Sequence, residues 1–325
     1  MILCVGLATV DLVYRVDRIP GADEKAQATG MEIAAGGPAA NAAVTVAALG
    51  EEVTLVTAIG AHPLGDLVRA DLTACGVRVI DCTPSTTDPP PVSAITVLEA
   101  TGERTIVSRN AAGVSVPVPP GGLPAAKVTL VDGHHPLLAA EAARTARHLV
   151  VDAGTWRPVF AELLPRAEIV ACSAAFRHPA AVTTPSPLDG DAATAAAAGA
   201  PHVIVTHGAG PVRWFSGGTD GAIEVPPVDA VDTAGAGDVF HGALAVALLR
   251  LHRSAPRRAV GTPAAPTGAP PHSSATHPTV GASTARGGRG SRPYASELPG
   301  LVKFAVDVAG VRVRHRGPRA WLSSL

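Results

Sequence analysis

Aromatic residues are scarce in this chain: tryptophan, tyrosine and phenylalanine together make up 3% of its 325 residues. Proteins that stack the bases of single-stranded nucleic acid depend on such side chains, so that class is disfavoured. Hydrophobic residues nevertheless make up 47% of the chain, which excludes disorder as its overall state. Because alanine and valine are abundant, we expect helices and strands to approach one another closely.

Cysteine is also rare. The chain has four cysteines, Cys4, Cys75, Cys82 and Cys172, and no CxxC pair, which disfavours both a disulfide framework and a cysteine zinc site. No apolar run reaches the roughly 18 residues that span a bilayer, and the N-terminus lacks a basic leader. These absences predict a cytoplasmic protein without membrane attachment.

Acidic residues are missing from one long segment. Between Arg253 and Arg292 the chain has six arginines and no aspartate or glutamate, although the whole chain has a net charge of -1. The remainder is therefore acidic overall, which argues against nucleic acid as a partner. Between Pro256 and Pro293, 13 of 38 residues are Gly or Pro, and Leu, Ile and Phe are absent. We expect residues 253–296 to be a disordered insertion, because they bury too little apolar surface.

Short apolar runs alternate with alanine-rich stretches of helical length over most of the chain. The predicted strands are 2–7, 53–60, 127–133, 148–154, 168–172 and 202–208, and the predicted helices include 38–49, 64–75, 137–147 and 238–251. Continuous apolar strands between helices are typical of a parallel sheet with both faces covered. We therefore predict a doubly wound α/β fold with a mainly parallel sheet. A helical pattern resumes at 298–313, so this interpretation makes residues 1–325 a single domain.

Two regions break this alternation. Residues 12–34 and 92–109 read as strands with polar residues at alternate positions, with no helix between the strands and a turn at Thr101 and Gly102. They predict a small second sheet that forms a lid.

The strongest local signal is the segment Val231–Leu249. It holds, in order, Asp232, Thr233, Gly235, Ala236, Gly237 and Asp238. The glycines allow a tight turn after an extended segment, and Asp238 opens a helix whose first amide groups have no partner within the helix. Such a turn predicts an anion cradle for a phosphate, with a carboxylate beside it that can accept a proton. The alternative is that Asp238 only caps the helix.

A second candidate site lies in the segment Ala34–Gly50. Gly36 and Gly37 form a turn before a helix in which only Asn41 and Thr45 are polar between Ala39 and Leu49. These two side chains share one helix face because they are four residues apart. The glycines would let a ligand approach the backbone, so Asn41 is a candidate ligand-binding residue. The alternative is that Asn41 bonds to a neighbouring backbone group.

Two weaker signals follow predicted strands. Asp11 comes after an apolar run from Cys4 to Val10, at the carboxyl edge where parallel sheets bind ligands. Thr206, Gly208 and Gly210 follow another strand and could line a nucleotide site. For both groups, an ordinary turn is the alternative.

With these pieces in order, the chain resembles the ribokinase-like sugar kinases of the phosphofructokinase-B type. The resemblance rests on ILCVGLATVDLVYRVDRIP (2–20), GGPAANAAVTVAALG (36–50), DTAGAGDVFHGALAVAL (232–248) and VAGVRVRHRGPRA (308–320). It is closest to the ketohexokinase and sulfofructose kinase groups. The resemblance implies a ribokinase-like fold with a β-lid, and an ATP-dependent kinase that phosphorylates a small sugar.

The resemblance also implies a role for each matched position. Asp238 becomes the base and Gly235, Ala236 and Gly237 the anion hole; Asp11, Gly36, Gly37, Asn41 and Arg104 bind sugar; Thr206, Gly208, Gly210 and Thr233 bind nucleotide. Mg²⁺ accompanies ATP in the family, and the position of Asp232 helps several members to hold a monovalent cation such as K⁺. The lid often forms a homodimer interface. A nucleoside kinase, or a sugar or nucleotide sensor with weak catalysis, remains an alternative.

The chain departs from the family pattern at two places. Residues 172–176 (CSAAF) lack the Asn and Glu that many relatives use to order Mg²⁺ through water. Pro38 stands where ketohexokinase has Asn, so the resemblance does not imply fructose as the sugar.

Overall fold

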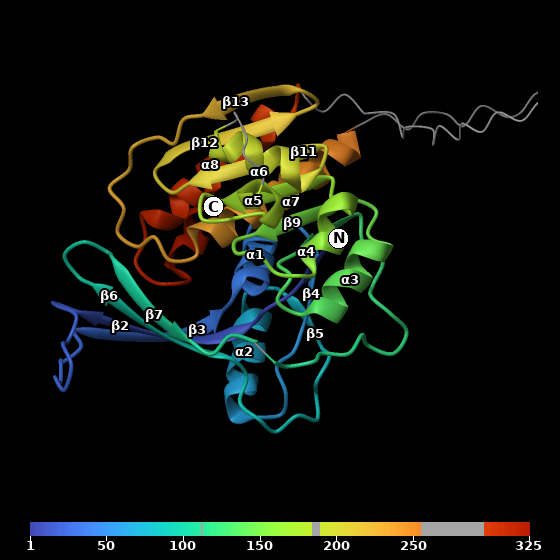
Figure 1. Ribbon diagram of the computed structural model, residues 1–325. Coiled ribbons are helices and arrows are strands. Elements are labelled where there is room, and N and C mark those ends of the chain that lie inside the picture. The colour runs from blue at the N-terminus through green and yellow to red at the C-terminus, as the bar shows by residue number, and fades with distance from the viewer. Residues whose placement is uncertain (112, 184–188, 255–295) are drawn as a thin grey trace, which may run out of the picture.

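The computed structural model describes residues 1–111, 113–183, 189–254 and 296–325 (Figure 1). The predicted insertion at 253–296 falls outside the described residues except at its margins. Arg253 and Ser254 still belong to helix α7 (Ala236–Ser254), which is therefore longer than expected. Among the described residues, no helix is both long enough and apolar enough to cross a membrane.

The predicted parallel sheet is present and has nine strands, in the order β13-β12-β11-β10-β9-β8-β1-β4-β5. The strands are β1 (Ile2–Val5), β4 (Val53–Thr57), β5 (Arg78–Asp81), β8 (Val128–Val131), β9 (Leu149–Ala153), β10 (Ile169–Ser173), β11 (His202–His207), β12 (Gly210–Ser216) and β13 (Thr219–Ile223). The seven strands from β5 to β11 pair in parallel, and the hairpin of β12 and β13 extends the sheet in antiparallel fashion.

Helices cover both faces of this sheet, as the alternation predicts. One core contains α1 (Pro38–Ala48), α2 (Pro63–Ala74), α7 and α8 (Leu298–Val313). The other contains α3 (Pro136–Thr145), α4 (Phe160–Leu163) with the 3-10 helix η1 (Leu164–Arg166), and the end of α6 (Gly190–Ala198). Neighbouring residues of one strand enter different cores: Cys4 packs in the first and Leu3 in the second. The short helices α5 (Pro179–Thr183) and η2 (Ala320–Ser324) complete the described elements.

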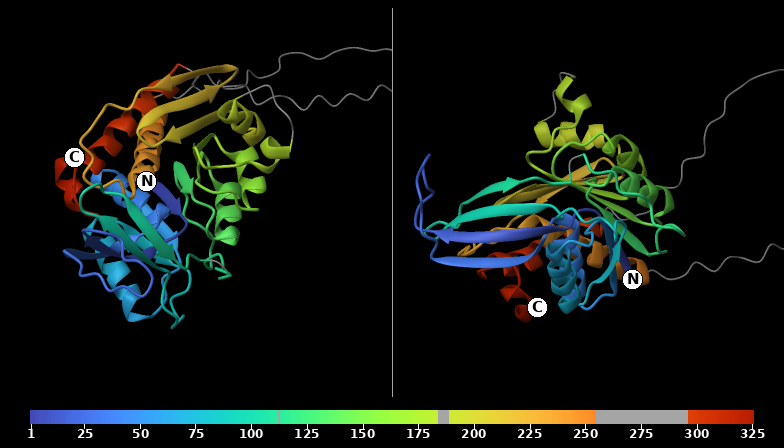
Figure 2. Two further views of the ribbon diagram at one scale, coloured as in Figure 1. Left: turned by 60° about the vertical axis from the view of Figure 1, so that its left-hand side comes forward. Right: turned by 90° about the horizontal axis from the view of Figure 1, so that it is seen from below.

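The lid is a separate sheet of four strands in the order β3-β2-β6-β7: β2 (Thr9–Val16), β3 (Gly30–Gly36), β6 (Val92–Leu98) and β7 (Arg104–Ser108). It projects from the main body beside α2, as Figure 1 and the right-hand view of Figure 2 show. The prediction of a second sheet is confirmed, and its first strand begins at Thr9, before the predicted start at residue 12.

Helices α1 and α7 approach closely, and glycine makes this possible. A Cβ atom on Gly242 of α7 would lie 2.6 Å from the carbonyl oxygen of Ala42 and 2.8 Å from Cβ of Thr45 on α1. The expectation of closely approaching backbones therefore holds at this contact. Each helix begins about one to two turns before it, so the contact places the N-terminal turns of α1 and α7 side by side.

Candidate active site

A cavity of about 490 Å³ lies between the lid and the N-terminal turns of α1 and α7. Eight of the residues predicted from sequence line it: Asp11, Gly37, Asn41, Arg104, Gly235, Ala236, Gly237 and Asp238. They come from the lid, from α1 and from the start of α7, which are distant in sequence. The fold thus brings the predicted anion cradle and most of the predicted sugar-binding positions to one cavity.

The tight turn predicted before the helix is present. Gly235 has φ +71°, a conformation that favours glycine, and α7 begins at the next residue. The first amide groups of a helix have no acceptor within that helix. The amide of Ala236 donates to the carbonyl oxygen of Thr233 at 3.3 Å. The amides of Gly235 and Gly237, together with the helix dipole, therefore favour an anion at this end of the cavity.

Asp238 lies in the first turn of α7, and its carboxylate accepts a hydrogen bond from Asn41 Nδ2 at 2.8 Å. Burial is the main cause that raises the pKa of Asp238 to about 7, and the neighbouring Asp152 carboxylate adds to it. The Asn41 bond opposes this shift because it stabilises the ionised form. A carboxylate with a pKa near 7 suits a general base at neutral pH.

The prediction for Asp11 was wrong about its strand, although the residue lines the cavity. The first strand ends at Val5, and Asp11 lies within the lid strand β2. The break occurs because the Asp132 carboxylate accepts a hydrogen bond from the amide of Leu7 at 2.8 Å, where a longer strand would continue. Asp11 is thus a residue of the lid.

Gly36 and Gly37 each occupy a position where a side chain would collide. A Cβ atom on Gly36 would lie 2.0 Å from Oδ2 of Asp11, so Gly36 makes room for that carboxylate. Gly37 has φ +95°, and a Cβ atom there would lie 2.5 Å from the carbonyl oxygen of Leu7. Gly37 lines the cavity, whereas Gly36 does not and lies against Asp11.

Arg104 connects the lid to the start of α7. Its guanidinium donates a hydrogen bond of 2.7 Å from Nη1 to the hydroxyl of Thr233. Thr233 is one of the predicted nucleotide-binding positions, so this contact joins a predicted sugar-binding residue to a predicted nucleotide-binding residue.

The other predicted nucleotide residues lie at the carboxyl end of β11, outside the lining of this cavity. The hydroxyl of Thr206 donates to the carbonyl oxygen of Cys172 on β10 at 3.3 Å. Gly208, with φ +63°, forms the turn into β12, which starts at Gly210. Since β9, β10 and β11 are parallel, these residues share the sheet edge at which Asp152 lines the cavity.

Several polar residues of the cavity were not predicted from the sequence to belong to the site. Asp132 follows β8, Asp152 lies near the end of β9, and His134 and Arg157 come from the loops after those strands. The rule that drew attention to Asp11, that ligands bind at carboxyl ends of parallel strands, would have found them.

Three of these residues, Asp152, His134 and Arg157, form side-chain contacts beside the cavity. Asp152 lies 3.1 Å from Nδ1 of His241, which is three residues after Asp238 on α7. The guanidinium of Arg157 donates to Nε2 of His134 at 2.8 Å. Burial lowers the pKa of His134, so the imidazole stays neutral and accepts this bond at pH 7.

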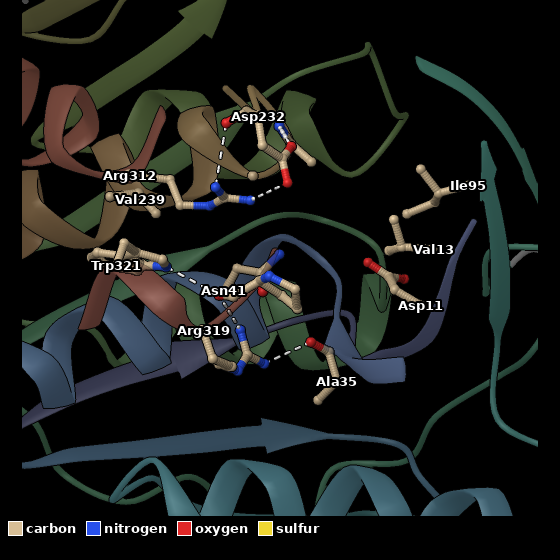
Figure 3. Close-up of a pocket in the computed structure, with 13 residues that line it drawn as sticks. Asp11, Val13, Ala35, Asn41, Ile95, Asp232, Val239, Arg312, Arg319 and Trp321 are labelled. Carbon is tan, nitrogen blue, oxygen red and sulfur yellow. Dashed lines mark hydrogen bonds and ion pairs between the residues drawn. The ribbon is translucent and has the colours of Figure 1, made fainter. Parts of the chain in front are cut away.

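Asp232 does not line the large cavity. It faces a smaller one of about 50 Å³, together with Asn41, Arg312 and Arg319 (Figure 3). Its carboxylate is paired with the side chains of Arg15 and Arg312.

Comparison with known proteins identifies relatives of this chain. The model of the pfkB family of carbohydrate kinases matches residues 1–269. The chain is 28% identical over 258 residues to ribokinase of Bacillus subtilis, an alignment that covers 76% of this chain and 85% of that protein. It is 29% identical over 106 residues to ketohexokinase of Mus musculus, which covers 33% of this chain and 36% of that enzyme.

Solved structures share the fold. Ribokinase of Thermotoga maritima superposes with a TM-score of 0.70 at 23% identity, covering 99% of this chain and 95% of that one. Ribokinase of Arabidopsis thaliana, solved with ribose and ATP, superposes with a TM-score of 0.66 at 19% identity, covering 99% of this chain and 97% of that one. At these identities the likeness establishes the ribokinase fold, including a large mostly parallel sheet and a separate small sheet.

Proposed function

The chain belongs to the pfkB family of carbohydrate kinases, and from this premise we propose that it transfers the γ-phosphoryl group of ATP to a hydroxyl group of a small sugar. The observation that carries the proposal is the position of Asp238. Its carboxylate stands beside an anion cradle, is held by Asn41, and lines a cavity large enough for a sugar. A relative named ribokinase makes ribose the first sugar to assay.

In this proposal, Asp238 accepts the proton of the attacking hydroxyl while the amides of Gly235 and Gly237 stabilise charge on the transferred phosphoryl group. Asp11 and Asn41 hold sugar hydroxyls close to Asp238, because all three line one cavity. Arg104 reaches from the lid to Thr233, so it closes the cavity over the phosphoryl group. Thr206, Gly208 and Gly210 contact the nucleotide at the carboxyl edge of β11. Positioning and fixed charge supply most of the catalysis of phosphoryl transfer.

Mg²⁺ fits the same proposal. The ion takes one or two protein carboxylates together with substrate phosphates. Asp152 is the side chain suited to hold it, since its carboxylate lines the cavity near the cradle. When bound, the ion neutralises charge on the phosphates.

The pH dependence of kcat/KM tests the role of Asp238. The carboxyl of Asp238 must be ionised to accept a proton, and its pKa is about 7. The logarithm of kcat/KM should therefore fall with a slope of one as the pH drops below 7. With an unperturbed aspartate, this acidic limb of the pH profile would lie near pH 4. In Asn41→Ala the limb should move to higher pH, because that bond lowers the pKa of Asp238. A limb at pH 4 to 5 in the unaltered enzyme would remove Asp238 from the role of base.

Substitution of the hydroxyl-binding side chains should separate the two substrates. We expect Asp11→Ala and Asn41→Ala to raise the KM for sugar by about tenfold, because a hydrogen bond to a charged or buried group contributes roughly 1.5 kcal/mol. The KM for ATP should change by less than about twofold. Steady-state kinetics with each substrate varied in turn measures both values, and equal increases in both would contradict this placement.

The lid offers a surface for a second copy of the chain. Strand pairing places Tyr14 beside Met31 and Leu12 beside Ile33, on the sheet face opposite to Asp11. Met31 is 56% exposed and Ile33 45%. We propose that these faces meet in a homodimer, and that the enzyme works in the cytoplasm, where ATP is available.

Sedimentation velocity tests the dimer. The unaltered chain should sediment as a dimer at micromolar concentration, and Met31→Lys with Ile33→Lys should sediment as a monomer because the charges are buried at the interface. A monomeric unaltered chain would contradict the proposal.

A further inference from the structure

Asp232 occupies the position that the family resemblance assigns to a monovalent cation, and its surroundings are those of a buried ion pair. Asp232 is buried, with 3% of its surface exposed. Oδ2 lies 3.1 Å from Nη2 of Arg15 on lid strand β2 and 3.3 Å from Nη2 of Arg312 on α8. The amide of Gly317 also donates to Oδ2 at 3.1 Å, and the amide of Ala234 donates to Oδ1 at 2.9 Å.

Arg312 makes a pattern of contacts that a bound cation would make. Its guanidinium faces three oxygen atoms from two loops: Oδ2 of Asp232, the carbonyl oxygen of Asp232 at 3.3 Å, and the carbonyl oxygen of His315 at 2.9 Å. The side chain of Arg312 is 4% exposed. Figure 3 shows it reaching from α8 to Asp232 at the edge of the smaller cavity.

A monovalent cation does not fit beside these groups. Cation sites are built from oxygen atoms with free lone pairs, but Oδ2 of Asp232 already faces two guanidinium groups and one amide. The smaller cavity is lined by Arg312 and also by Arg319, whose positive charges would repel a cation at short range. The residues present therefore disagree with the K⁺ site that the resemblance implies.

We propose that Arg312 is a built-in replacement for the monovalent cation, so that this kinase works at full rate without K⁺. Arg312 is a positioning residue: it holds Asp232, whose Oδ1 accepts the bond from the amide of Ala234, one residue before the cradle glycine. Arg15 extends the arrangement to the lid. The K⁺ independence rests on the proposed kinase function, whereas the claim that no cation binds beside Asp232 does not.

The experiment compares the unaltered chain in KCl, NaCl and tetramethylammonium chloride at one ionic strength. We expect kcat/KM to agree within about twofold across the salts. Tm should agree within about 1 °C, because a cation that binds the native state would raise Tm in its own salt. Thallium(I) serves as a probe for K⁺, and its ²⁰⁵Tl NMR resonance should not broaden when the unaltered chain is added. The Tm and thallium readouts remain valid if no sugar is phosphorylated, a result that would count against the proposed function alone.

Arg312→Ala turns the same site into one that can take a cation. It should lose at least about tenfold in kcat/KM in tetramethylammonium chloride, because a buried partner of Asp232 is removed. Either K⁺ or guanidinium ion should restore part of the activity and raise Tm. Arg312→Gln, which also removes the positive charge, serves if Arg312→Ala does not fold. Arg144→Ala, which removes an exposed pair with Glu141 on α3, is the control that should change nothing.

Two results would overturn the proposal. One is activation of the unaltered chain by K⁺ of more than about tenfold, or a Tm that K⁺ raises by several degrees. The other is a folded Arg312→Ala protein that neither K⁺ nor guanidinium ion reactivates.

Discussion

Asp238→Asn should bind ATP with nearly unchanged affinity and lose a factor of about 10² to 10⁴ in kcat, the range typical of removing a general base. The amide has the shape of the carboxylate and can still accept the hydrogen bond from Asn41, which is 2.8 Å long in the unaltered chain. It cannot take a proton from a sugar hydroxyl at neutral pH. Single-turnover transfer from labelled ATP measures the loss of the chemical step apart from binding.

A matched control shows that the effect belongs to the site. Asp307→Asn removes a carboxylate whose side chain is 50% exposed and pairs with Lys303 on α8, and it should leave kcat within about twofold of the unaltered value. Turnover of Asp238→Asn above a tenth of the unaltered rate would remove Asp238 from the role of base. The chain would then be a binding protein that has the fold of a kinase.

Gly36→Ala should raise the KM for sugar by about 10- to 100-fold, which corresponds to about 1.4 to 2.7 kcal/mol. The added Cβ atom would lie 2.0 Å from Oδ2 and 2.2 Å from Cγ of Asp11, so the carboxylate must leave its position. That position also accepts a 2.6 Å hydrogen bond from the hydroxyl of Thr9, which would be lost. The affinity for ATP should stay the same, because the collision is confined to the lid side of the cavity.

A double-mutant cycle identifies the cause. Once Asp11→Ala has removed the colliding carboxylate, adding Gly36→Ala should change the sugar KM by less than about twofold, so the two effects are strongly non-additive. Gly310→Ala is the control, because a Cβ atom there meets nothing within 4 Å. Additive effects of Gly36→Ala and Asp11→Ala would show that Gly36 acts by some route other than Asp11.

Features encoded by local sequence could be predicted, and these include most of the fold. Continuous apolar runs such as 53–60 and 202–208 predicted parallel strands because both faces of the sheet are buried, and β4 and β11 lie there. Gly235 and Gly237 predicted a tight turn before a helix, and α7 begins there. The lid was predicted from its polar alternation, which only a sheet with one exposed face can show.

Contacts between distant segments could not be predicted. The bond between Asn41 and Asp238 joins residues 197 apart and depends on how closely α1 and α7 pack at Gly242. Asp11 was placed directly after the first strand because the apolar run continues past Val5, while the cause of the break, Asp132, lies 125 residues beyond Leu7. The partners of Asp232 come from β2 and α8, at opposite ends of the chain, and no local pattern indicates that they meet.

Detection of the phosphorylated sugar is the decisive test of phosphoryl transfer by this chain. The unaltered chain, ATP and Mg²⁺ are incubated with a panel of sugars that begins with ribose and includes nucleosides, and ³¹P NMR follows the phosphorus atoms. The account predicts a sugar phosphomonoester formed in equal amount to ADP, and its absence with Asp238→Asn. Phosphorylation of nucleosides but no sugar, or binding of sugar and ATP without any phosphomonoester, would contradict the account.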